Sequence, residues 1–213
     1  MTTADRTARL ASTVLAAAVP PLLHRMRNDL DQNGALRRGT QKLMWTAYAT
    51  FGLLLTESLV RHNRDVPVSQ RVAGYTVAAA GTALAVGSMT SFASPQQLNG
   101  GEPGDLITGG IHDYSRHPQY AGFVAATAGL ATARRSPRAA LLTIKLAVIM
   151  RAWVAVEEQH LRRQFGEAYE RVCSRVPRWI GVPSSDLLLR DRASHHSTDT
   201  RRSGPTRSAD VSH

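Results

Sequence analysis

Two groups of polar residues in this sequence have side chains suited to binding a charged ligand. Arg116, His117 and Pro118 are consecutive in the first group, and Glu157 and Glu158 form the second. Arginine offers a planar set of donors to a carboxylate, histidine adds another donor, and proline fixes φ at the start of a helix. The glutamates accept hydrogen bonds from ammonium or hydroxyl groups. This pattern predicts a site for a ligand that has both an anionic and a cationic end.

Each group has a simpler interpretation when it is considered alone. The Arg116-His117-Pro118 run is typical of a basic anchor at a membrane surface, where a helix begins. The glutamate pair is typical of a solvated helix turn just beyond a membrane. The order of the two groups, on either side of an apolar hairpin, favours a shared binding site.

The residues around both groups resemble the isoprenylcysteine carboxyl methyltransferase-like family, which includes phospholipid methyltransferases. Residues 106–122 read LITGGIHDYSRHPQYAG, similar to the family pattern Thr-x-Gly-x-x-x-x-x-Arg-His-Pro-x-Tyr-x-Gly. Residues 157–178 contain the paired glutamates, Phe-Gly-x-x-Tyr and Val-Pro-Arg in the family's order. The resemblance covers roughly residues 72–180.

This resemblance implies an integral-membrane methyltransferase that uses S-adenosylmethionine. In such a site, tyrosine rings face adenine or the cationic sulfonium, and glycines let the backbone approach the ligand. The candidate cofactor-binding residues are Gly110, Tyr114, Arg116, His117, Pro118, Tyr120, Gly122, Glu157 and Glu158.

The candidate catalytic residues are Arg116, Glu158 and Arg151. Arg151 is included because it precedes Glu158 by two helical turns, which places both on one helix face about 10.5 Å apart along the axis. Both side chains are therefore expected to line one cavity. Lys145 falls on another face of the same apolar run, where it snorkels or pairs with another helix. Glu57 is one possible partner.

Three positions depart from the family pattern. His112 stands where the family usually has tyrosine, and Asp113 where a basic residue is common. Trp153 stands where relatives that methylate prenylcysteine tend to have an arginine. The methyl acceptor therefore stays open between a prenylcysteine-like carboxylate, a phospholipid amine and a thiol. A related polytopic reductase that uses NADPH, and a membrane scaffold without catalysis, are the alternative functions.

Metal and dinucleotide sites are not expected. Cys173 is the single cysteine, so the sequence has neither an intramolecular disulfide nor a cysteine-based zinc site. The pair His195-His196 lacks further ligands at metal spacing. The glycines of residues 100–104 lack the flanking strand and helix of a dinucleotide fingerprint.

Apolar stretches predict an all-α, polytopic membrane bundle. Four of them cover residues 43–60, 72–93, 120–133 and 139–156, and residues 10–23 form a fifth, so we expect four to five transmembrane or interfacial helices. Glycines in 72–93 predict close packing against a neighbouring helix. Residues 94–117 form a loop, and the amphipathic pattern of 157–178 predicts a helix that continues out of the bilayer into the cytosol.

The two ends of the chain differ from the apolar core. Pro20 and Pro21 interrupt the first apolar run, which basic residues follow in place of a cleavage site, so it is interpreted as an uncleaved segment. Whether this run spans the membrane is left open. We divide the chain into an N-terminal segment with a basic loop (1–42), a membrane methyltransferase core (43–183) and a mostly disordered polar tail (184–213).

The net charge of +10 fits a membrane protein with basic loops. Lysines and arginines cluster between the apolar stretches without interleaved aromatic residues, a pattern that argues against nucleic-acid binding. If residues 10–23 lie at the interface, both termini share one side of the membrane, and the positive-inside rule then places residues 94–117 and 157–178 in the cytoplasm. The expected location is the cell membrane. The expected partners are membrane lipids and a lipophilic or small acceptor.

Overall fold

The computed structural model describes residues 3–61 and 65–183, and the chain is helical wherever these residues form regular structure. The polar tail predicted for 184–213 lies outside the described residues. The elements in chain order are α1 (Thr3–Asn33), α2 (Arg38–Arg61), α3 (Val68–Met89), α4 (Pro95–Leu98), the 3₁₀ turn η1 (Gly110–Asp113), α5 (Pro118–Ala133), α6 (Pro137–Phe165) and α7 (Glu167–Arg175).

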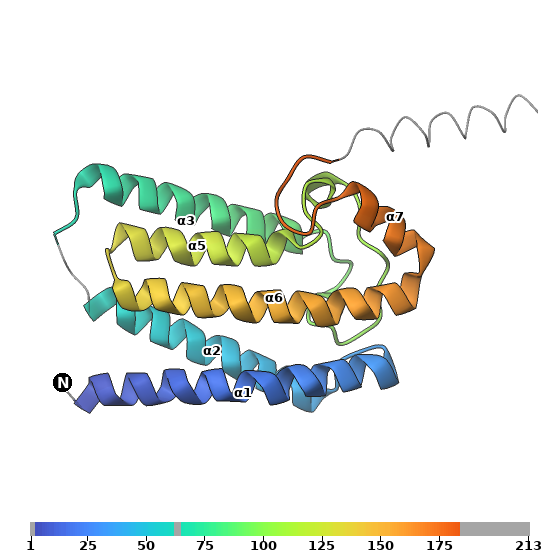
Figure 1. The fold of residues 1–213 in the computed structure, drawn as a ribbon, viewed down its shortest axis with the longest axis horizontal. Coiled ribbons are helices and arrows are strands. Elements are labelled where there is room, and N and C mark those ends of the chain that lie inside the picture. The colour runs from blue at the N-terminus through green and yellow to red at the C-terminus, as the bar shows by residue number, and fades with distance from the viewer. Residues whose placement is uncertain (1–2, 62–64, 184–213) are drawn as a thin grey trace, which may run out of the picture.

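Helix α6 lies in the middle of the bundle (Figure 1). It contacts α5 on one side and both α1 and α2 on the other, and α3 packs against α5. Helices α2, α3 and α6 are long and apolar enough to cross a membrane. Helix α5 has 16 residues and therefore a length of about 24 Å. These features confirm the predicted helical membrane bundle.

Glycines bring α3 and α5 into backbone contact. A Cβ atom added at Gly81 would lie 2.5 Å from the backbone N of Ala126, and one added at Gly122 would lie 2.6 Å from the backbone N of Ala85. Only a residue without a side chain permits this approach. The close packing predicted for residues 72–93 is therefore confirmed.

Helix α1 differs from the interrupted segment that its prolines predict. It is continuous from Thr3 to Asn33 with Pro20 and Pro21 inside it. Both prolines are exposed, so their rings point away from the packed face, and each removes only one backbone donor. The helix runs alongside α2 and α6, and its N-terminal end lies at the opposite end of the bundle from α7 (Figure 1). The N-terminus therefore does not share one side of the bundle with residues 167–175, which corrects the arrangement expected for an interfacial first segment.

The helix predicted across residues 157–178 is also corrected. Gly166 has φ of +50° and ends α6, so the chain turns and α7 begins at Glu167. A residue with a side chain rarely adopts this conformation. Helix α6 has 29 residues and a length of about 44 Å, which exceeds the roughly 30 Å of a bilayer's hydrocarbon core. Its last turns therefore extend beyond the apolar zone.

The charged residues inside the apolar stretches have separate partners. Lys145 donates a hydrogen bond from Nζ to Oγ of Ser12 on α1, at 2.7 Å. Glu57 pairs within its own helix, with Oε1 3.0 Å from Nε of Arg61. The pairing of Glu57 with Lys145 considered from the sequence is therefore not formed, and Lys145 instead ties α6 to α1.

Candidate active site

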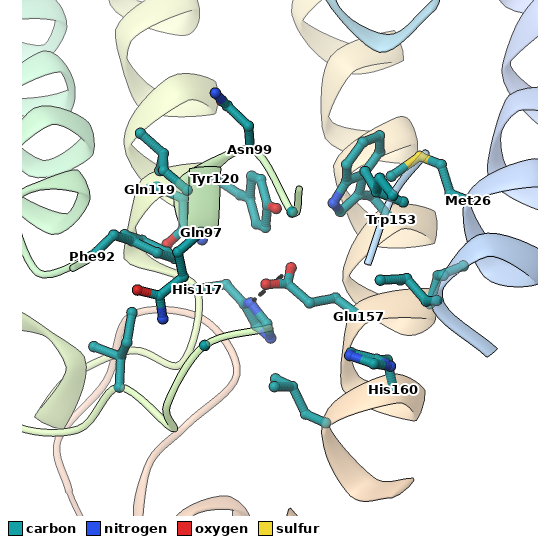
Figure 2. Close-up of a pocket in the computed structure, with 18 of the residues that line it drawn as sticks. Met26, Phe92, Gln97, Asn99, His117, Gln119, Tyr120, Trp153, Glu157 and His160 are labelled. Atoms are coloured by element: carbon teal, nitrogen blue, oxygen red, sulfur yellow. Dashed lines mark ion pairs between the residues drawn. The ribbon is translucent and has the colours of Figure 1, made fainter. Parts of the chain in front are cut away.

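A cavity of about 510 Å³ opens at the end of the bundle that holds the 90–117 loop and α7. Its volume falls within the roughly 300–1,000 Å³ of small-molecule sites. One side is formed by α5, α6, α7 and the loop, and the other by α1 and α2. Figure 2 shows side chains from these elements directed towards a common space.

Arg116 and His117 reach this cavity from the turn that precedes α5. Pro118 is the first residue of that helix and His117 is its N-cap. The backbone N–H of His117 donates to Oγ of Ser115 at 3.2 Å, and that of Arg116 donates to the carbonyl oxygen of Pro177 at 3.0 Å. These bonds fix the turn against the segment that follows α7, so both side chains are held in position.

Glu158 is almost fully buried and is surrounded by arginine and histidine side chains. Its Oε1 atom lies 3.2 Å from Nη2 of Arg116 and 3.5 Å from Nε2 of His117. Arg178 donates to both carboxylate oxygens, from Nε at 3.0 Å and from Nη2 at 2.7 Å. Such a two-point contact is among the strongest that a carboxylate makes. Glu158 therefore joins α6 to the turn before α5 and to the segment after α7.

Glu157 points in a different direction from its neighbour, because successive helical residues are rotated by about 100°. It lines the cavity, with Oε2 3.6 Å from Nδ1 of His117. Figure 2 shows its carboxylate between His117 and the open space, with Trp153 and His160 on the same helix. The two glutamates thus have separate roles: Glu158 holds the structure and Glu157 faces the cavity.

Several buried polar atoms of the cavity have no hydrogen-bond partner among the described residues. They are Nε of Arg116, both ring nitrogens of His117, Nε2 of His112, Oε1 of Gln119, Oε2 of Glu157 and the hydroxyl of Tyr169. A buried donor or acceptor left unpaired costs about 1–3 kcal/mol. A ligand with matching donors and acceptors would remove this cost.

The rings around these atoms are described by the stacking of His117 on Tyr120 and by the protonation of His112. The His117 and Tyr120 rings stack with centroids 5.9 Å apart. Burial lowers the pKa of His112 below its usual value, against the opposing effects of the Ser88 backbone and Asp113. His112 is therefore neutral near pH 7, with one nitrogen free to accept a hydrogen bond.

Four residues of the candidate set line the cavity: Arg116, His117, Tyr120 and Glu157. Gly122 instead contacts α3, as described above. Tyr114 is exposed and its carbonyl oxygen accepts from Gly181 N at 3.0 Å. Pro118 begins α5, and Gly110 provides a positive φ of 61° at the start of η1.

The two other candidate catalytic residues also lie outside the lining. Glu158 is occupied by the arginines described above, and Arg151 is exposed on α6. The expectation that Arg151 and Glu158 line one cavity is therefore not met. Their seven-residue spacing is slightly less than two turns of 3.6 residues each, so the two side chains point in slightly different directions from the helix axis. Contacts with neighbouring elements then bury Glu158 and leave Arg151 exposed.

Sequence patterns missed several lining residues. His160 lies three positions after Glu157, a spacing that places it on the same helix face, so helical periodicity carried a usable signal. Gln119 occupies a position of the family motif at which any residue is allowed, so the motif did not indicate it. Tyr48 comes from α2, and no local pattern indicates that this helix meets α6. Among the described residues, no group of three His, Cys, Asp or Glu side chains is arranged to hold a metal ion.

Comparison with known proteins identifies the part of the chain that carries the motifs. The model of the phospholipid methyltransferase family matches residues 69–168, which include α3, α5 and nearly all of α6. No curated protein and no solved structure matches the chain. The family match confirms the resemblance inferred from the motifs, and the apolar helices agree with membrane integration. Residues 69–168 therefore match the phospholipid methyltransferase family, and this match together with the apolar helices α2, α3 and α6 supports a membrane-integrated methyltransferase.

Proposed function

We propose that the cavity binds S-adenosylmethionine and that the protein transfers its methyl group to a lipophilic or small acceptor at the membrane. The set of unpaired buried atoms is the observation that carries this proposal. It combines a cationic donor, an anionic acceptor and neutral acceptors within one space. That combination matches a ligand with a carboxylate, an ammonium group and a polar base.

The side chains divide between the ends of this ligand. Nε of Arg116 is a donor for the carboxylate, and Oε2 of Glu157 accepts from the ammonium group or from ribose hydroxyls. Oε1 of Gln119 accepts from an amino group, and the Tyr120 ring offers an aromatic face. Glu158 and Arg178 act indirectly, since they hold Arg116 and His117 in place.

The bound cofactor supplies an activated methyl group on a positively charged sulfur. The protein's own contribution is to align that group with an acceptor and to exclude water. The apolar part of the cavity provides the second binding region, with Phe51, Phe123 and Leu146 in its lining. An acceptor with an apolar body fits against these residues.

We place the cavity on the cytoplasmic side of the cell membrane. The end of the bundle that holds the cavity contains the basic residues of the α1–α2 turn and of α7, which the positive-inside rule assigns to the cytoplasm. Arg6 lies at the opposite end of the bundle, so it no longer supports this orientation. The cofactor would then enter from the compartment in which it is made.

Equilibrium binding to the purified protein in detergent tests this proposal. We expect S-adenosylmethionine and its demethylated product to bind, with affinity reduced at least about tenfold in Arg116→Lys and Glu157→Gln, each of which loses one charge-assisted bond. Arg71→Lys on the remote part of α3 and the exposed Glu170→Gln are the matched controls. NADPH binding in place of S-adenosylmethionine would favour the reductase, and binding of neither would leave a scaffold.

A further inference from the structure

The charged residues of the cavity contrast with those of the whole chain. The sequence has 26 lysines and arginines against 16 acidic residues. Among the described lining residues, however, Arg116 is the only lysine or arginine, and Glu102, Asp105 and Glu157 supply three carboxylates. Arg116 already contacts the buried carboxylate of Glu158. The cavity is therefore an acidic site within a basic protein.

Aromatic side chains are concentrated in the same place. The chain has three Trp, five Tyr and four Phe residues, and eight of these twelve line the cavity. The lining members are Trp45, Tyr48, Phe51, Phe92, Tyr120, Phe123, Trp153 and Tyr169. Faces of aromatic rings carry negative potential and attract cations.

Three of these rings form a continuous wall between α2 and α6, which we call the aromatic wall. The Trp45 and Tyr48 rings have centroids 5.8 Å apart, and those of Tyr48 and Trp153 are 6.4 Å apart. Figure 2 shows Trp153 across the open space from Tyr120, with the Glu157 carboxylate between them and His117. A positively charged group in this space meets rings and a carboxylate together.

We infer that the acceptor is a lipophilic amine without a neighbouring phosphate, whose amino group lies between the aromatic wall and Oε1 of Glu157, the carboxylate oxygen that is not assigned to the cofactor. This inference rests on the proposed function. An ammonium group is attracted by both features, whereas a carboxylate or phosphate there would face Glu157 without a free cationic partner. In phosphatidylethanolamine only two carbons separate amine from phosphate, so the phosphate would also enter the acidic site.

The reaction balances with groups that are present. The ammonium form of the acceptor first gives one proton to the imidazole of His160, which lines the cavity. The nitrogen lone pair then forms a bond to the methyl carbon as the carbon–sulfur bond breaks. The electron pair of that bond stays on sulfur, which becomes a neutral thioether, and the methylated nitrogen carries the positive charge.

Binding of matched amphiphiles provides the test. The protein, saturated with demethylated cofactor in dodecyl maltoside micelles, is titrated calorimetrically with dodecyltrimethylammonium and with dodecanoate. We expect the ammonium compound to bind at least about tenfold more tightly, the size of one or two cation–π contacts. Tyr48→Leu and Trp153→Leu should remove most of this preference, and Tyr75→Leu, on α3 and outside the cavity, should keep it. Equal affinities, or tighter binding of dodecanoate, would overturn the inference.

Turnover separates this inference from the proposed function. With methyl-labelled cofactor, dodecylamine should be labelled at least about tenfold faster than dodecanoate, dodecanethiol or dilauroyl phosphatidylethanolamine. Faster labelling of dodecanoate or dodecanethiol would refute an amine acceptor, and faster labelling of the phosphatidylethanolamine would refute an acceptor without a neighbouring phosphate. Both outcomes would leave the methyltransferase proposal intact. Failure to bind S-adenosylmethionine in the first place would instead refute the proposed function.

Discussion

Arg178 binds both carboxylate oxygens of Glu158, with its Nη2 atom 2.7 Å from Oε2 and its Nε atom 3.0 Å from Oε1. The same carboxylate contacts Arg116, which lines the cavity. One buried glutamate therefore connects the segment after α7 to the candidate active site. Its removal would leave the guanidinium groups without their anionic partner.

We predict that Glu158→Gln destabilises the folded protein by about 3 kcal/mol, because loss of one member of a buried ion pair leaves the other uncompensated. Unfolding can be followed in detergent with a thiol-reactive dye, since Cys173 is the single cysteine. Glu170→Gln removes an exposed carboxylate that pairs with Arg162, so it should change stability little. Equal melting temperatures for the two variants would contradict the role of Glu158.

Alanine at Gly129 should separate α3 from α5. Its Cβ atom would lie 2.4 Å from the backbone N of Ala78, and neither backbone can move without loss of packing. We expect a loss of about 1–3 kcal/mol in the free energy of unfolding. Gly52→Ala is the control, because a Cβ there meets nothing within 4 Å and helix propensity should add up to about 1 kcal/mol. A tolerated Gly129→Ala would show that the two helices pack differently.

Protonation of His112 should reduce stability at mildly acidic pH. Its pKa is lowered in the folded protein by burial, so the unfolded chain binds the proton more readily and stability falls as pH decreases through and below the usual value of about 6.5. The groups that face it are the Ser88 backbone, His117, Asp113 and Glu157. His112→Gln should show a flatter dependence of melting temperature on pH between 7 and 5, and an unchanged slope would exclude this group as the cause.

His160→Gln should slow transfer to an amine without weakening cofactor binding. We expect a rate lower by at least about a hundredfold at neutral pH, which is the lower limit of what a general base contributes. The groups around His160 are Asp31 on α1 and Glu157, Arg163 and Gln164 on its own helix. In the unmodified protein the rate should fall at acidic pH as the imidazole becomes protonated. A variant with the same acidic limb in its pH–rate profile would show that another group accepts the proton.

Sequence patterns predicted the elements that depend on local composition. The hairpin of α5 and α6 and the close packing of α3 follow from apolar stretches and glycine positions, and both are present. The family motif placed Arg116 and His117 at a helix start, where the structure has them. The continuity of α1 through Pro20 was not predicted, because exposure of the prolines depends on how the bundle packs.

Long-range contacts account for the rest. Adjacent glutamates look equivalent in a sequence, yet helix rotation turns Glu158 to the arginines and Glu157 to the cavity. Gly122 fits a ligand-binding motif, but in the structure its lack of a side chain allows α5 to pack closely against α3. Tyr48 belongs to a helix outside the family match, so only the folded structure shows that it faces Trp153.

The cavity joins two parts of the chain, and only one of them lies within the family match. Arg116 and Glu157 belong to the matched domain, whereas Met44 and Tyr48 on the opposite wall precede it. Under the proposed function, exchange of the first two helices would alter the acceptor side of the cavity while Arg116 and Glu157 keep their contacts with the methyl donor. The wall built by α1 and α2 could then determine the acceptor independently of the residues proposed to hold the cofactor.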